Sequence, residues 1–123
     1  MRYVIIIEVS KGKVGIREAR SPEICEAVLI IISFVPLGKV VSYKAVADLL
    51  KIHPRTVANC VKHNPAPLII PCHRVVHKTG DIGGYSFGGR DVKKKILVIE
   101  KALAKGARKV SSLNFYDLRW LTI

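Results

Sequence analysis

Cys72 and His73 are adjacent residues whose side chains could carry out nucleophilic chemistry. A cysteine becomes a strong nucleophile when a neighbouring group generates or stabilises its thiolate, and a histidine oriented by a carboxylate does this. Glu100, at the edge of the apolar face of an expected helix, is the candidate carboxylate. From residue types alone, Cys72 could equally be a buried residue that only packs in the core, because most buried cysteines are inert.

The segments on either side of Cys72 are expected to be loops. Asn64-Pro65-Ala66-Pro67 ends the preceding helix, because each proline disfavours helical backbone in the residue before it. Leu68-Ile69-Ile70 then leads into Pro71-Cys72-His73-Arg74-Val75-Val76, where no helix fits. Downstream, five glycines between Gly80 and Gly89 predict an adaptable loop around Tyr85 and Ser86. This loop lacks the Gly-Lys-Ser/Thr ending of a phosphate-binding loop.

Two short helices before Cys72 predict a helix-turn-helix. Ser42 is an N-cap for a helix over 43–50, and a break at 52–54 leads to a second helix over 55–63. On the second helix, Val57, Ala58 and Val61 should face inward. The opposite side is a polar stripe of Arg55, Asn59 and Lys62. Such a stripe suits DNA contact and a plain solvated face about equally well.

The remaining elements frame this core. Residues 2–9 and 13–19 predict a β-hairpin that covers the core, and Ser21-Pro22 opens a buried helix that continues to Val35. A last helix is expected from about Arg90 to Lys105, with Val92, Ile96, Ile99 and Leu103 inward and Gly106 as its end. The fold class is mixed α/β, mainly α: a winged-helix-like helix-turn-helix domain with a short N-terminal β-hairpin.

Composition favours a polyanionic partner. Twenty-one Lys and Arg against nine acids give a net charge of +12, which attracts nucleic acid in a salt-sensitive way. The longest apolar run, about 27–37, is too short to cross a bilayer, and no signal peptide is evident, so a cytoplasmic protein without membrane association is expected. The three cysteines form no secreted disulfide framework; Cys25 and Cys60 are expected as buried packing, with their pairing left open.

Several motifs in order resemble one family, the O6-alkylguanine-DNA alkyltransferases. Pro71-Cys72-His73-Arg74-Val75 is similar to its acceptor pentapeptide, and the similarity extends upstream through Asn64–Ile70. Gly80-Asp81-Ile82-Gly83-Gly84-Tyr85-Ser86 and the helix reaching Glu100 also fit, as does Pro36–Tyr43 at the start of the DNA-binding element. The resemblance covers about residues 22–105.

The resemblance implies a role for each site residue. Cys72 would accept the alkyl group, activated through a water by His73, which Glu100 orients. Tyr43 would press on the adjacent phosphate and help protonate the departing guanine. Asn64 would tie the second helix of the helix-turn-helix, the recognition helix, to the turn that holds Cys72. Gly83, Tyr85 and Ser86 would line the base pocket.

The implied DNA contacts lie mainly on the second helix. It would enter the minor groove, with Arg55 in the place of the flipped-out base. The DNA-binding set is Arg55, Thr56, Asn59, Lys62, Tyr43 and Arg74.

The resemblance also implies a reaction. An alkyl group on O6 of guanine lies inside the stack of double-stranded DNA, so the nucleotide must rotate into a pocket before a thiolate can reach it. The expected activity is that of a methylated-DNA–protein-cysteine S-methyltransferase. Because the thioether has no good leaving group, the protein is expected to be consumed in one turnover. We also expect a monomer that needs no cofactor and no metal.

The chain departs from the family at its ends. The family commonly has a separate N-terminal α/β domain, whereas only about twenty residues precede the first matched helix here. We expect one domain over 1–123, in which the hairpin of residues 1–20 replaces that domain or a separate partner supplies it. Phe87 is an extra residue in the pocket loop, and the aromatic tail, 109–123, lies outside the resemblance.

Four alternative interpretations account for part of the sequence. A lesion-sensing module would keep the fold, but relatives of that kind replace the acceptor cysteine. A zinc site could draw on Cys60, His63, Cys72, His73 and His77, although these lack the paired spacing of structural zinc sites. A cysteine hydrolase leaves too little room for a substrate cleft, and a plain winged-helix transcription factor would not explain Cys72 and Glu100. His53, His63 and His77 are given no role.

Overall fold

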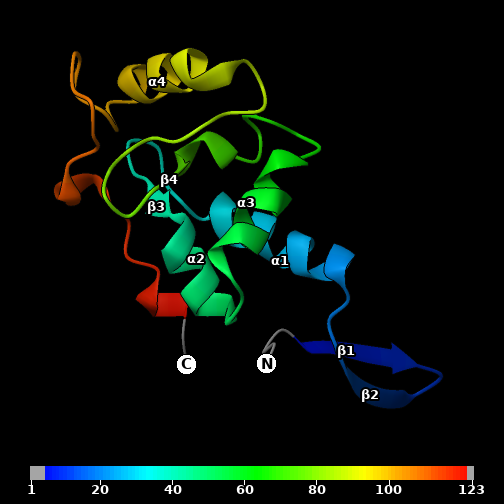
Figure 1. Cartoon of the computed structure of the whole chain (residues 1–123). Helices are drawn as coiled ribbons and strands as arrows, with labels where there is room; N and C mark the ends of the chain where they lie inside the picture. The colour runs from blue at the N-terminus through cyan, green and yellow to red at the C-terminus, as the bar shows by residue number, and fades with distance from the viewer. Residues whose placement is uncertain (1–4, 122–123) are drawn as a thin grey trace.

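The computed structural model describes residues 5–121 and shows a mainly helical domain with two small β-sheets (Figure 1). Residues 2–4 of the expected hairpin and 122–123 of the tail lie outside the described residues. The elements are β1 (Ile5–Ser10), β2 (Lys13–Glu18), α1 (Ser21–Ser33), β3 (Val41–Ser42), α2 (Tyr43–Leu50), α3 (Pro54–Lys62), β4 (Val75–Val76) and α4 (Gly89–Ile99), with 3-10 turns at Cys72–Arg74, Ser112–Asn114 and Arg119–Leu121. No helix in the described range is long and apolar enough to cross a membrane.

Helix α1 is the centre of the main core. Its start is fixed by the Glu23 carboxylate, which accepts a hydrogen bond from the Arg20 N–H at 2.9 Å. Its apolar residues recur at helical spacing, and the buried ones pack against Val46 of α2 and Val57 of α3. Each fully buried side chain of this size contributes about 1.5–3 kcal/mol. The packing therefore fixes where α2 and α3 lie.

The helix-turn-helix forms as predicted, with local caps at each end. The Ser42 hydroxyl accepts a hydrogen bond from Ala45 N–H at 2.9 Å and starts α2, and Lys51 in the left-handed region ends it. His53 Nδ1 accepts from Arg55 N–H at 3.0 Å and starts α3. Arg55, Asn59 and Lys62 are all exposed, so the polar stripe on α3 faces solvent.

A short parallel sheet connects α2 to the Cys72 turn. Val41 pairs with Val75 and Ser42 with Val76, which places the start of α2 beside the residues after the turn. A second apolar cluster, including Ile82 and Leu97, packs behind this sheet beneath α4. The sheet thus brings together segments 34 residues apart in the chain.

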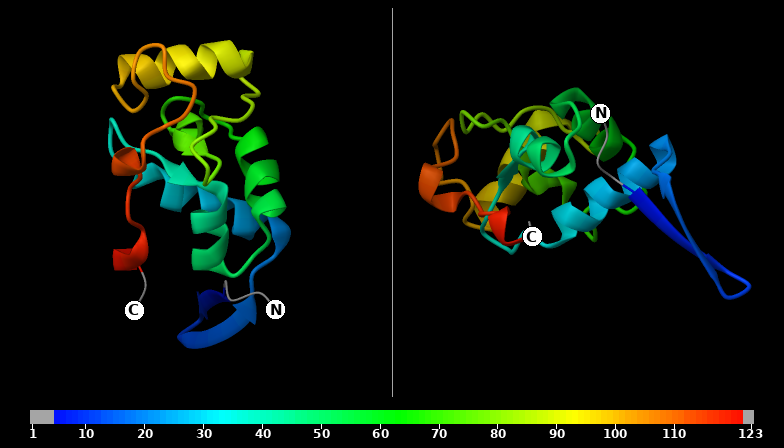
Figure 2. Two further views of the ribbon diagram at one scale, coloured as in Figure 1. Left: turned by 60° about the vertical axis from the view of Figure 1, so that its left-hand side comes forward. Right: turned by 90° about the horizontal axis from the view of Figure 1, so that it is seen from below.

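The C-terminal tail packs along the body of the domain (Figure 2). Tyr116 N–H donates to Val40 O at 2.7 Å, and Val40 N–H donates to Asn114 O at 2.9 Å. Leu118 is buried in the main core, and Trp120 contacts Phe34 edge-to-face with 5.6 Å between ring centroids. The sequence could not place this tail, which the structure shows to be part of the core.

The hairpin does not cover the core, which corrects our expectation. It projects from the start of α1 (Figures 1 and 2). The residues Ile7, Val9, Val14 and Ile16 are 64–72% exposed. It is held to α1 by Arg17, whose guanidinium donates to Glu23 at 2.6 Å and also contacts Glu8.

Helix α4 ends at Ile99, six residues before its predicted end at Lys105. This corrects the predicted C-terminal boundary of the helix. Lys101 adopts a left-handed backbone, and Ala102 and Leu103 N–H both donate to Leu97 O. The inner face is Lys93 and Leu97, whereas Ile99 is 79% exposed. The early end matters because it turns Glu100 toward the Cys72 turn.

Cys25 and Cys60, which we expected to be buried and whose pairing the sequence left open, form a disulfide between α1 and α3. The bond joins residues separated by 35 positions in sequence. In the chain-entropy model, closing a loop of this length stabilises the folded state by about 4 kcal/mol. The disulfide therefore ties the recognition helix to the central helix.

Candidate functional site

Cys72 lies at the start of a tight turn, with its side chain almost fully buried. Its N–H donates to Ile70 O at 2.8 Å, and Arg74 N–H donates to Pro71 O at 2.9 Å. Asn64, buried at the end of α3, donates from Nδ2 to Ile70 O at 2.9 Å and accepts from Ala66 N–H at 2.9 Å. Asn64 thus ties the recognition helix to the turn, as the resemblance implied.

The Glu100 carboxylate lies against the other side of this turn. His73 Nε2 lies 3.0 Å from Glu100 Oε2, and Arg74 donates to both carboxylate oxygens at 3.0 and 2.9 Å. A third bond from Arg74, to Val35 O at 2.9 Å, anchors the guanidinium to the end of α1. Burial raises the pKa of Glu100, but the bonds from Arg74 and His73 outweigh it and lower the pKa. The carboxylate is therefore ionised at neutral pH.

The ionised Glu100 determines which nitrogen of His73 carries the proton. Nε2 must donate to the carboxylate, so neutral His73 has its lone pair on Nδ1. Nδ1 is buried and has no hydrogen-bond partner among residues 5–121. Burial lowers the pKa of His73, although Glu100 acts in the opposite direction. His73 is therefore a neutral imidazole with a free acceptor atom, the form a general base requires.

The Cys72 thiol is held in its neutral form until a base acts on it. Burial raises its pKa, while the Asn64 amide and the Lys93 ammonium reduce that effect. A thiol of raised pKa needs a base at neutral pH, and His73 is the adjacent residue. Cys72 is also the single free cysteine, since all three cysteines lie in the described range and the other two are bonded together.

A cavity of about 610 Å³ opens beside Cys72, between the recognition helix and the glycine-rich loop. The predicted residues that line it are Tyr43, Arg55, Lys62, Cys72, Tyr85 and Ser86. Gly83 borders it: a Cβ there would lie 3.0 Å from His77 Nε2, and its φ of +73° favours glycine. Thr56 and Asn59 line an adjoining hollow with Arg55. The structure thus gathers most of the predicted pocket and DNA-binding residues on one face.

Arg74 was predicted to bind DNA, but it does not lie with the other predicted DNA-binding residues. Its guanidinium is bonded to Glu100 and to the Val35 carbonyl, and its side chain is 14% exposed. All of these contacts are inside the protein. The structure therefore gives Arg74 the role of holding Glu100 in place.

Lys93 is the main site residue that sequence reasoning missed. It is 1% exposed, and its ammonium donates to Val75 O at 2.7 Å and Gly84 O at 3.1 Å, 5.8 Å from the centre of the Tyr43 ring. Burial lowers its pKa to about 8. Lys93 joins β4 to the cavity loop and places a positive charge near Cys72.

Replacing Lys93 with Met should make Cys72 less reactive. Below pH 8 the ammonium is charged and favours the Cys72 thiolate, so its loss should slow alkylation by iodoacetamide at pH 7 about tenfold, equivalent to ~1.4 kcal/mol. The measurement is the rate of iodoacetamide addition from pH 6 to 9. Lys94→Met, one residue away and outside the cavity lining, is the matched control. An unchanged pH profile in Lys93→Met would contradict this role.

Two histidines given no role also lie at the cavity. His53 caps α3 and lines the cavity beside Arg55. His77 stands next to Tyr43, with ring centroids 5.2 Å apart. Spacing alone gave no signal for either, because both come to the cavity through the packing of separate segments. Within residues 5–121, no three His, Cys, Asp or Glu side chains are grouped as a metal site would require, and Cys60 of the weighed zinc set is bonded to Cys25.

Comparison with known proteins identifies the family. A family model described as 6-O-methylguanine DNA methyltransferase, DNA binding domain, matches residues 23–102, about two thirds of the chain. The chain belongs to this family. The methylated-DNA–protein-cysteine methyltransferase of Methanocaldococcus jannaschii is 48% identical over 80 residues, covering 65% of this chain and 47% of that protein. The protein of the same name from Pyrobaculum aerophilum is 48% identical over 69 residues, covering 56% and 46%. The chain thus spans about half the length of the curated relatives it matches.

Solved structures agree with this membership. Mycobacterium tuberculosis OGT in complex with DNA matches with a TM-score of 0.61 and 32% identity over 69% of this chain and 51% of that one. S. pombe Atl1, in complex with damaged DNA containing O6-carboxymethylguanine, matches with a TM-score of 0.68 over 80% and 99% of the two chains. At 21% identity the second likeness shows the fold alone. The predicted helix-turn-helix fold of this methyltransferase-family domain is confirmed.

Proposed function

We propose that this chain repairs DNA by transferring an alkyl group from O6 of guanine to Sγ of its own Cys72. The observation that carries the proposal is the buried thiol beside a 610 Å³ cavity, next to a histidine with a free Nδ1 and a carboxylate on Nε2. Relatives named methylated-DNA–protein-cysteine methyltransferases support the same reaction. No step of it needs a cofactor.

The protons and bonds of the step balance within the site. His73 Nδ1 takes the thiol proton through a water, and Glu100 stabilises the imidazolium that forms. The thiolate attacks the alkyl carbon, so a sulfur–carbon bond forms as the carbon–O6 bond breaks. Burial and the nearby Cys72 raise the pKa of Tyr43, which keeps the phenol protonated and able to donate to the departing guanine. The proton taken up by His73 then returns through water to the Tyr43 phenolate, and the products are an unmodified guanine in the DNA and an alkylated protein that cannot react again.

The face that carries the cavity is the proposed DNA-binding surface. The base must leave the stack to reach Cys72, at a cost of a few kcal/mol that is lower for a badly paired lesion. Arg55 stands at the cavity rim, where it could take the place of the base, while Asn59 and Lys62 extend the stripe along α3 toward phosphates. Gly83, Tyr85 and Ser86 would contact the guanine. We further propose that the protein works as a monomer in the cytoplasm.

The test is the intact mass of the protein after incubation with duplex DNA containing one O6-methylguanine. We expect a gain of one methyl group per molecule, located on the peptide that contains Cys72. The control is the same duplex with unmodified guanine, which should leave the mass unchanged. Binding of the methylated duplex without a mass gain would favour a lesion-sensing module, and a methyl group on another residue would refute the assigned acceptor.

A further inference from the structure

A second concentration of positive charge lies outside the site. Residues 89–109 contain eight basic and two acidic side chains, which is a net +6 of the chain's +12. Most of the basic residues are exposed on α4 and on the loop that follows it. The exposed residues that form this α4-loop patch are Lys95, Lys101, Lys105, Arg108 and Lys109.

No ion pair neutralises the charge of the α4-loop patch among the described residues. Within residues 5–121, none of its five members makes an ion pair or a side-chain hydrogen bond, whereas Arg17, Arg90 and Lys44 each pair with a carboxylate. Glu100, the acid closest to Lys101 in sequence, is already bonded to His73 and Arg74. The patch therefore presents a local positive field that attracts polyanions.

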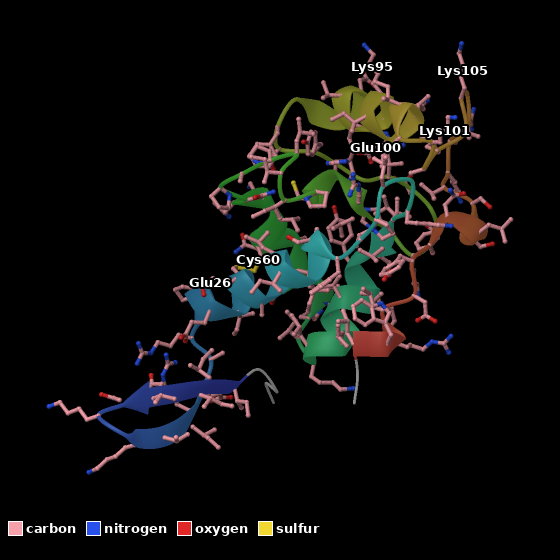
Figure 3. The ribbon with its side chains drawn as sticks, turned by 180° about the vertical axis from the view of Figure 1, so that it is seen from behind. Glu26, Cys60, Lys95, Glu100, Lys101 and Lys105 are labelled. Carbon is pink, nitrogen blue, oxygen red and sulfur yellow. A yellow bond between two sulfur atoms is a disulfide. The ribbon has the colours of Figure 1, made fainter. Side chains whose placement is uncertain are left out.

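The α4-loop patch faces away from the recognition helix. In Figure 3, Lys95, Lys101 and Lys105 extend from the outer side of α4 and its loop, far from Cys60 of α3. Figure 1 likewise shows α4 at one end of the molecule, with the Cys72 turn between it and α3. A straight duplex seated on α3 would leave this patch uncovered. The protein thus has two basic surfaces that point in different directions.

We propose that the α4-loop patch is a second binding surface for duplex DNA, which lets one molecule hold two duplex segments. The inference rests on the proposed function in that α3 holds the first segment. Duplex DNA suits the patch because lysine contacts to phosphates are electrostatic and need no shaped pocket. The patch would hold the repair protein on neighbouring DNA while the cavity samples bases.

The test is whether the protein bridges two duplexes. A short duplex with O6-methylguanine is fixed to beads, and retention of a labelled, unmodified duplex is measured with and without protein over a range of salt concentrations. We expect wild-type protein to retain the label. Lys101→Gln/Lys105→Gln should weaken retention and make its log–log salt dependence shallower by about 1.8, since each lost phosphate contact contributes about 0.9.

The matched control is Lys11→Gln/Lys13→Gln in the hairpin turn. It removes the same charge, and each pair includes one lysine with positive φ: 62° at Lys101 and 49° at Lys11. Wild-type retention in the control and loss in the patch variant would support the proposal. It is refuted if wild-type protein retains no label, if the patch variant retains the label normally, or if both variants lose it equally.

The methyl-transfer assay on a single short duplex separates this inference from the proposed function. All three proteins should gain one methyl group, because neither lysine pair touches the cavity. Bridging without any mass gain would refute the repair reaction and leave the second DNA surface standing. Mass gain without bridging would refute the second DNA surface and leave the repair reaction standing.

Discussion

Cys72→Ala is expected to abolish alkyl transfer completely while leaving DNA binding within about threefold of wild type. The cavity then has no nucleophilic sulfur, and the other two cysteines are joined in the disulfide. Binding should persist because the α3 stripe and the cavity rim do not involve the thiol. The measurements are intact mass after prolonged incubation and the Kd for the methylated duplex at fixed salt.

The control for this variant is Cys25→Ser/Cys60→Ser, which removes the disulfide and keeps Cys72. At a temperature where it remains folded, it should still gain one methyl group. A residual mass gain in Cys72→Ala would show that another residue accepts the alkyl group. That outcome would contradict the assignment of the acceptor even if the protein repairs DNA.

Glu100→Gln is expected to slow methyl transfer roughly 100-fold, the scale of a lost general-base contribution. The amide cannot bind His73 and Arg74 as the carboxylate does, so His73 loses the partner that fixes its tautomer and stabilises its charged form. Breaking this largely buried network should also destabilise the fold by about 3 kcal/mol. Single-turnover rates, normalised to the folded fraction, separate the two effects.

The pH dependence of stability provides a second readout for Glu100. Its pKa is lowered in the folded state, so its contribution is fully present above the ordinary value of 4.5 and is lost as the pH falls through the folded-state pKa. The gap in unfolding free energy between wild type and Glu100→Gln should therefore narrow in acid. Glu100→Asp, which keeps the charge, should recover part of the rate. A constant gap from pH 7 to pH 3 would contradict the assigned ionisation.

The parts of the fold with local causes could be predicted from the sequence. Ser42 as a cap and the apolar spacing of α3 are short-range signals, and the helix-turn-helix formed as they indicated. The Cys72, His73 and Glu100 set was inferred from the resemblance and from residue chemistry, and the structure brings the last two together. The cap and the apolar spacing depend on few long-range contacts, whereas His73 and Glu100 are 27 residues apart and were grouped by their chemistry and the resemblance.

The missed features depend on contacts between distant segments. A buried lysine is stable only when carbonyls meet it, and the partners of Lys93 come from β4 and the glycine-rich loop, which no periodicity reveals. The apolar residues of β1 and β2 predicted a hairpin that covers the core, but the hairpin projects away and leaves these residues exposed. The predicted end of α4 was wrong because Leu103 is apolar and at helical spacing from Ile96 and Ile99. In the structure it is buried from a loop that follows the helix.

The pairing of Cys25 with Cys60 has a practical consequence for counting active molecules. With those two sulfurs bonded, each unreacted chain carries one titratable thiol, and each alkylated chain should carry none. Thiol titration of denatured but unreduced protein would then give the fraction still competent for repair. A colorimetric thiol reagent could follow the consumption of the purified protein without labelled DNA.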